Sequence, residues 1–186
     1  MDQRELVERA RRGDHDALAQ LVDPALARLD AAARLILRDP ELARDAVQEA
    51  LIRTWRDLPG LRDPDRFDAW LHRLTVNVCL DLARHRRRRP IEVEITPLDS
   101  PMTSDVSGHL ADRELVDHAL RGLDPGHRAV VALHYLLGMP LPQVATSLGI
   151  PVGTAKSRLH YALAAMRMAA AEPDTAPGPV TGGQVA

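Results

Sequence analysis

Cysteine, lysine and aromatic residues are all scarce in this chain of 186 residues. Its one cysteine, Cys79, excludes an intramolecular disulfide and a cysteine-based zinc site. Aromatic side chains make up only 3% of the residues, so a hydrophobic core must be built from leucine, valine and alanine. No apolar run approaches the roughly 18 residues that span a membrane. The polar N-terminus also lacks a signal-peptide core. We therefore expect a cytoplasmic protein without membrane insertion.

The sequence also lacks the usual patterns of catalysis and metal binding. Its eight histidines are scattered and show no metal spacing with a third ligand. There is no glycine-rich phosphate loop. Asp14, Asp16 and Asp23 have the spacing of helix caps and surface residues rather than of a catalytic pair. These observations predict no enzymatic activity, no catalytic residue, no metal site and no cofactor.

Alanine- and leucine-rich sequence without alternating β-branched runs predicts an all-α fold. Two small helical domains are expected, residues 1–89 and 110–171, joined by a flexible acidic linker at 90–109 and followed by a disordered tail at 172–186. Apolar spacing and cap signals predict the individual helices, at 3–12, from Asp14 to Val22, 24–37, 41–58, 66–86, 110–122 and from Asp124 to Leu137.

Residues 138–167 have the pattern of a helix, a tight turn and a second helix. The first helix is predicted over 141–148, with Gly149 in the turn and Ile150 buried. Polar side chains on the second helix lie off its apolar stripe, and residues 141–167 contain no acidic residue. Such a face after a glycine turn suits the DNA major groove.

Charge is strongly segregated, although the net charge is only −2. Residues 84–89 contain five arginines, more than a helix C-terminus needs for its dipole, which favours contact with nucleic acid. Residues 91–117 contain seven acids and one arginine. On spacing alone, the polar face of the helix at 41–58 is better explained as a solvated surface with ion pairs.

Together these segments resemble a known family. DAVQEALIRTW at 45–55, FDAWLHRLTVNVCLDLARHRR at 67–87, a proline-rich linker and LDPGHRAVVALHYLLGMPLPQVATSLGIPVGTAKSRLHYALAAMR at 123–167 are similar to a bacterial sigma factor of the extracytoplasmic-function (ECF) class. The resemblance covers roughly residues 3–168. It implies an RNA polymerase specificity subunit that directs the core enzyme to promoters and initiates transcription.

The resemblance also implies roles for particular surfaces. The implied partner is core RNA polymerase, through its β′ and β subunits, and the first domain would dock on the β′ coiled coil. The same domain would melt and read the −10 element of promoter DNA. A flipped base would be held by the loop at 58–66. The second domain would read the −35 element as duplex. The linker would thread toward the active centre, and an anti-sigma factor is an expected partner.

Site residues are carried over by matching positions. The face implied for core polymerase is Asp45, Gln48, Glu49 and Arg53. The −10 contacts implied are Arg62, Arg66, Trp70, Arg73, Asn77, Arg84, Arg86, Arg87 and Arg88. The −35 contacts implied are Val152, Thr154, Lys156, Ser157, Arg158 and His160.

Some positions depart from the family pattern. Pro140 and Pro142 stand where a hydroxyl cap and carboxylates are common, so the first helix of the helix-turn-helix is expected to lack its cap. An alternative remains open: a conventional helix-turn-helix regulator whose N-terminal domain senses a ligand or dimerises. A weaker alternative is a helical adaptor. The basic helix end favours the sigma factor, because a ligand-sensing domain needs a pocket instead.

Overall fold

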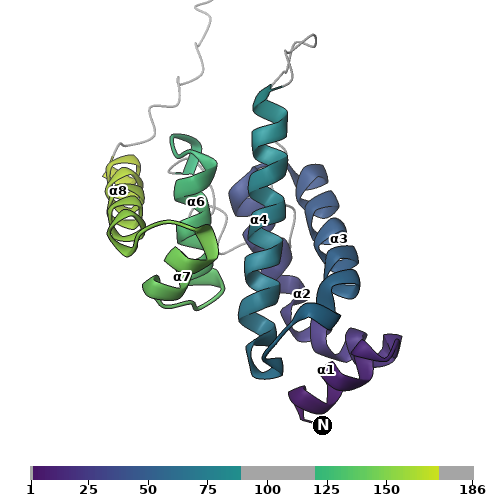
Figure 1. Cartoon of the computed structure of the whole chain (residues 1–186). Coiled ribbons are helices and arrows are strands. Elements are labelled where there is room, and N and C mark those ends of the chain that lie inside the picture. Colours follow the sequence, from purple (N-terminus) through teal and green to yellow (C-terminus); the bar gives the residue numbers. More distant parts are fainter. Residues whose placement is uncertain (1, 89–119, 172–186) are drawn as a thin grey trace, which may run out of the picture.

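The computed structural model describes residues 2–88 and 120–171, with side chains placed as far as Met168. Within these ranges every regular element is helical (Figure 1), in agreement with the all-α prediction. The predicted linker at 90–109, most of the predicted helix at 110–122 and the predicted tail at 172–186 lie outside the described residues.

The N-terminal half consists of four helices and two short 3₁₀ turns. Its elements are α1 (Gln3–Arg11), α2 (His15–Leu37), α3 (Pro40–Asp57), η1 (Leu58–Gly60), η2 (Pro64–Arg66) and α4 (Phe67–Arg88). α2, α3 and α4 pack against one another, and α1 lies across one end of α2 (Figure 1).

The C-terminal half is smaller. Its elements are α6 (Pro125–Val131), the π-helical turn η3 (Ala132–Leu136), α7 (Leu141–Leu148) and α8 (Val152–Ala171). The single helix predicted from Asp124 to Leu137 therefore changes to a π turn after Val131. α7 has the predicted bounds, and Gly149, the C-cap that follows it, adopts φ 64°, the left-handed conformation for which glycine has no steric cost.

The core of the N-terminal half has few aromatic side chains, and small residues on α3 fill part of it. The buried stripe of α3 consists of Ala43, Ala46, Ala50 and Thr54, all fully inaccessible. Such a stripe lets neighbouring helices approach closely. The Thr54 hydroxyl donates to the Ala50 carbonyl at 2.7 Å, so no buried polar group is left unpaired there. Trp55 is half-buried and stacks on His15 with ring centroids 4.2 Å apart.

Two predictions about local structure are wrong. Residues 15–37 form one continuous helix, not two, although Pro24 lies inside it. Proline costs about 3 kcal/mol in a helix interior. However, Pro24 is exposed, and buried residues before and after it, including Leu21 and Leu29, join the same core. Ile150 is only half-buried, because it lines an open cleft between the two halves.

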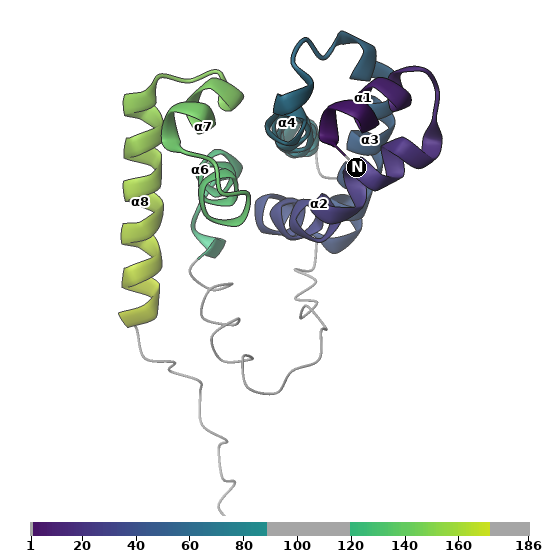
Figure 2. The same ribbon diagram turned by 90° about the horizontal axis from the view of Figure 1, so that it is seen from below.

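The two halves are in direct contact (Figure 2). α6 and η3 pack against α2, and α6 and α7 also touch α4. Nothing in the sequence pattern predicts this contact.

The buried thiol of Cys79 provides a test of the α4 packing. Burial raises the pKa of this thiol to about 12. An exposed thiol has a pKa near 8.5, so at pH 8 the folded protein holds roughly a thousandfold less thiolate than the unfolded chain. We expect a thiol-reactive disulfide reagent to label Cys79 at least about 100-fold more slowly without denaturant than with it. Fast labelling of protein with unchanged helicity by circular dichroism would contradict the packing.

Candidate nucleic-acid interface

The outer face of α3 combines charge with one exposed apolar side chain. Asp45 and Gln48 are exposed, and Glu49 accepts a hydrogen bond from Arg53 Nε at 2.7 Å. Ile52, which sequence reasoning missed, lies on the same face and is 55% exposed. The signal was available, because Ile52 is a large apolar residue away from the buried stripe. A single exposed apolar side chain is common on protein surfaces, and here it adds an apolar contact point to the charged face.

A pocket of about 270 Å³ opens between α3 and α4. It brings together Trp70, Arg73 and Asn77 from α4, three of the residues that the family resemblance implies for the −10 element. Arg53 and Arg56 of α3 also line it, so Arg53 belongs to this pocket as well as to the outer face. Arg56, which pairs with Asp57 at 2.7 Å, was missed by sequence reasoning. The pocket offers one aromatic ring and three arginines, beside the carboxylate of Asp57. The ring and the arginines suit an unpaired base and its phosphate.

The loop between α3 and α4 presents two of the predicted arginines. Arg62 is exposed, and Arg66 is exposed with its Nε 3.4 Å from Asp63. The apolar side chains Leu58, Leu61 and Phe67 are buried and anchor the loop to the core. The loop is therefore an ordered, arginine-bearing edge beside the pocket.

The arginines at the end of α4 lie in different environments. Arg84 Nη1 pairs with Asp81 at 2.6 Å, and Arg86 Nη1 pairs with Asp39, the N-cap of α3, at 2.9 Å. Arg86 thus joins two helices of the fold. Arg87 lines the cleft between the halves, and Arg88 is exposed.

The second helix of the helix-turn-helix, α8, presents its predicted residues on two sides. Val152, Lys156, Ser157 and His160 are exposed, whereas Thr154 is half-buried. Ser157 donates its hydroxyl to the Gly153 carbonyl at 3.0 Å. The preceding helix α7 has Pro140 as N-cap with no side-chain hydrogen bond, as the sequence predicts.

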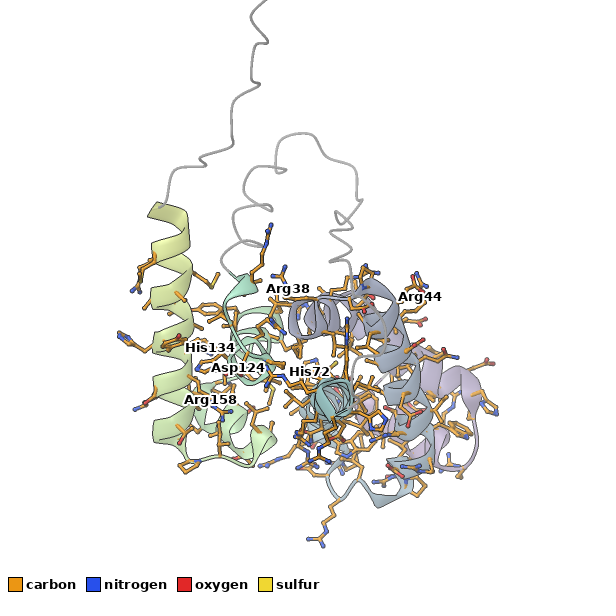
Figure 3. All side chains as sticks on the ribbon, turned by 90° about the horizontal axis from the view of Figure 1, so that it is seen from above. Arg38, Arg44, His72, Asp124, His134 and Arg158 are labelled. Atoms are coloured by element: carbon orange, nitrogen blue, oxygen red, sulfur yellow. The ribbon has the colours of Figure 1, made fainter. Side chains whose placement is uncertain are left out.

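Arg158 is half-buried and turns toward α6 (Figure 3). It lines a cleft of about 310 Å³ between the two halves, together with Arg84 and Arg87 of α4. Three residues predicted to contact DNA at different promoter elements therefore share one narrow space. A cleft of this size has no room for duplex DNA.

A buried guanidinium holds the two halves together. Arg128 of α6 is 8% exposed and donates from Nε to the Ile36 carbonyl of α2 at 2.8 Å, and from Nη1 to the Leu123 carbonyl at 2.7 Å. Burial lowers the pKa of Arg128 to about 10, with nearby Arg38 acting in the same direction. The group still carries its charge at neutral pH.

The N-terminus of α6 is capped by Asp124. Its Oδ1 accepts from the amides of Gly126 and His127, and Oδ2 lies 2.5 Å from the His127 ring nitrogen. Burial alone would raise the pKa of Asp124, but these contacts outweigh it and lower the pKa below its usual value.

Comparisons with known proteins identify the family. The family model of Sigma-70 region 2 matches residues 21–89, and the model of Sigma-70, region 4 matches residues 113–166. The chain belongs to the sigma-70 family of RNA polymerase sigma factors. It is 38% identical over 133 residues to the ECF RNA polymerase sigma factor SigL of Mycobacterium tuberculosis, covering 70% of this chain and 75% of that one. It is also 37% identical to the RNA polymerase sigma-E factor of Streptomyces coelicolor, covering 73% and 75%. These relatives place it in the ECF class.

Solved structures show the same architecture. CnrH in complex with the cytosolic domain of CnrY is 29% identical, with a TM-score of 0.63, covering 90% of this chain and 96% of that one. The sigma factor RpoE of Bartonella quintana, in complex with the anti-sigma factor NepR, shares the fold at a TM-score of 0.62 and 21% identity, covering 81% and 94%. Within residues 2–88 and 120–171, no group of three potential metal ligands is found. The described helices include none long and apolar enough to cross a membrane.

Replacing Arg128 tests the contact between the halves. Arg128→Met keeps the length of the side chain but leaves the Ile36 and Leu123 carbonyls without their donor. A buried polar group without a partner costs about 1–3 kcal/mol. We expect a larger radius of gyration by small-angle X-ray scattering, with helicity unchanged by circular dichroism.

The matched control is Arg121→Met, because Arg121 is exposed. This variant should scatter like the original protein. An unchanged radius for Arg128→Met would show that the apolar contacts alone keep the halves together.

Proposed function

We propose that this ECF sigma factor uses three surfaces to bind core polymerase, the −10 element and the −35 element. The outer face of α3 binds core RNA polymerase, at the β′ coiled coil. The pocket between α3 and α4, with the adjoining loop, binds the unpaired strand of the −10 element. The exposed side of α8 reads the −35 element as duplex. The protein supplies specificity and strand separation and has no enzymatic activity of its own.

One observation carries this assignment: Trp70, Arg73 and Asn77 line a single pocket with arginines of α3. A base extruded from a duplex needs an aromatic surface to stack on and cations for its phosphate. A regulator that senses a ligand would also use a pocket, but three arginines beside one aromatic ring suit a nucleotide better than a small uncharged ligand. The pocket therefore favours the sigma factor over the alternative regulator at the level of individual residues.

The arrangement of the two halves supports a closed state that does not bind promoters. Arg84, Arg87 and Arg158 face one cleft, although their proposed DNA partners lie at separate elements. The halves must part before α8 and the end of α4 can both contact DNA. A protein that keeps the halves together would act as an anti-sigma factor, and we propose such a partner for this chain. Its place of action is the cytoplasm, where the polymerase is.

Changing the α3 face tests the assignment to core polymerase. Asp45→Arg reverses an exposed charge, and Ile52→Asp removes the apolar centre of the same face. Residues at the centre of an interface commonly cost about 2 kcal/mol or more when lost, so we expect core affinity to fall at least about tenfold. Binding of fluorescently labelled protein to purified core polymerase measures this.

The matched control is Asp23→Arg, the same charge reversal on an exposed residue of α2. It should bind core polymerase like the original chain. Transcription from genomic promoter fragments should fall in parallel with core affinity. If both α3 variants bind core polymerase normally, the outer face of α3 is not the docking surface.

The chain's only lysine tests the assignment of α8. Lys156 is exposed and acts on a phosphate as a point charge. With holoenzyme and promoter duplex, Lys156→Ala should weaken binding for all sequences and reduce the slope of log affinity against log salt by about 1. Arg167→Ala removes a cation from the exposed C-terminal part of the same helix and should leave the slope unchanged. Equal slopes for Lys156→Ala and the original chain would exclude the phosphate contact.

A further inference from the structure

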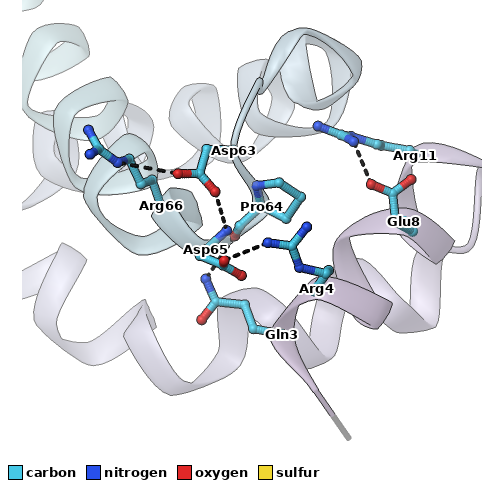
Figure 4. A network of polar contacts seen from close by, with 8 residues as sticks. All are labelled: Gln3, Arg4, Glu8, Arg11, Asp63, Pro64, Asp65 and Arg66. Carbon is cyan, nitrogen blue, oxygen red and sulfur yellow. Dashed lines mark hydrogen bonds and ion pairs between the residues drawn. The ribbon is translucent and has the colours of Figure 1, made fainter.

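The first helix of the chain contacts the loop that follows α3. α1 ends at Arg11, before the residues matched by the Sigma-70 region 2 family model, 21–89. It nevertheless packs on both 3₁₀ turns of the loop, and polar side chains of α1 reach the backbone of the loop (Figure 4). These contacts join residues about 50 positions apart in the sequence.

Arg11 holds the first half of the loop. Its Nε donates to the Leu58 carbonyl at 3.5 Å, and its Nη2 donates to the Leu61 carbonyl. Nη1 pairs with Glu8 at 2.6 Å, which fixes the guanidinium plane. The Arg11 side chain is 21% exposed. Because the two carbonyls lie on either side of Pro59 and Gly60, one side chain sets the path of that turn.

The second half of the loop is held by the start of α1. Gln3 Nε2 donates to the Pro64 carbonyl at 3.2 Å, and Arg4 Nη2 pairs with Asp65 at 2.6 Å. A residue of the loop itself also stabilises this turn, because Asp63 Oδ1 accepts a hydrogen bond from the Asp65 amide at 3.1 Å. Backbone carbonyls at both ends of the loop are thus bound by α1.

The residues on the outward side of the held backbone are accessible to a ligand. Pro59, Gly60, Arg62 and Arg66 are exposed, whereas Leu58, Leu61 and Pro64 are buried. A binding loop with a fixed backbone loses less conformational entropy when its ligand arrives. It also discriminates better among similar ligands, since its contacts cannot shift to suit each one.

We propose that α1 positions this loop for capture of the unpaired promoter base, with Arg11 as the principal positioning residue. Arg11 itself does not touch DNA in this role. It acts by setting where the loop backbone and Arg62 lie relative to the pocket of Trp70. The inference rests on the proposed function of the loop and adds to it a determinant of base preference outside the region 2 match.

The test uses holoenzyme and single-stranded DNA with a short randomised segment. DNA retained by each holoenzyme is sequenced, which gives a base preference at every position and requires no defined promoter. Arg11→Ala removes both donors to the loop, and Arg11→Lys keeps the charge but cannot fork to two carbonyls. We expect both variants to lose about fivefold to tenfold of the preference at one or two positions, the range of a lost base contact.

Affinity for core polymerase is the second readout, and both Arg11 variants should keep it within about twofold. The matched control Arg12→Ala removes a neighbouring, exposed arginine and should change neither readout. Arg4→Ala is a milder variant, because an exposed ion pair contributes little to stability. It should weaken preference at the same positions without loss of helicity.

Three results would overturn the proposal, each in a distinct way. Unchanged preference in Arg11→Ala would show that the loop keeps its geometry without α1. Parallel loss of core binding, helicity and preference would show that Arg11 only stabilises the fold. If the unaltered holoenzyme retains all sequences equally, base capture itself fails, and the positioning role fails with it.

Discussion

The contact between the two halves is built around one buried cation, Arg128. Taking a guanidinium out of water is costly, and two backbone carbonyls return only part of that cost. Nearby Arg38 and Arg87 add like charge, which is one reason that the pKa of Arg128 falls to about 10. The contact between the halves therefore combines apolar packing with an electrostatic cost. Such an interface holds a defined arrangement but can still open, as the proposed binding to DNA would require.

The N-terminal half depends on a different constraint, the shortage of aromatic side chains. With alanines and Thr54 on the inner stripe of α3, the helices come close together. Phe67 is fully buried, whereas both tryptophans are only half-buried. Trp70 lines the pocket and Trp55 stacks on His15 at the edge of the core. Large rings at a margin are available to ligands. The same composition that makes the core compact thus leaves an aromatic surface for a base.

Local signals in the sequence predicted the elements well. The Asp39-Pro40 pair fixes the start of α3, since the Asp39 carboxylate accepts from the Leu42 amide. Gly149 fixes the end of α7 through its left-handed conformation. Both depend on residues a few positions apart, which a sequence shows directly. Trp70, Arg73 and Asn77 were grouped only through the family resemblance, and the family itself was confirmed.

Contacts between distant residues were not predictable in this way. Arg128 reaches Ile36 across 92 positions, and Arg11 reaches Leu61 across 50, with no periodic signal to connect them. The continuity of α2 through Pro24 has the same origin, because packing on both sides of the proline outweighs its local preference. The uncapped start of α7 was visible in the sequence, but the position of Arg158 in the cleft was not, since it depends on how the halves meet.

Arg53 belongs to two of the proposed surfaces at once. It pairs with Glu49 on the outer face of α3 and also lines the pocket that contains Trp70. A ligand bound at either surface would therefore change the contacts of the same guanidinium. Docking that draws Glu49 toward the polymerase would release Arg53 to the pocket, where a phosphate would be its natural partner. The proposed polymerase and DNA surfaces are therefore linked through one side chain, which gives a physical route by which core binding could favour capture of the promoter strand.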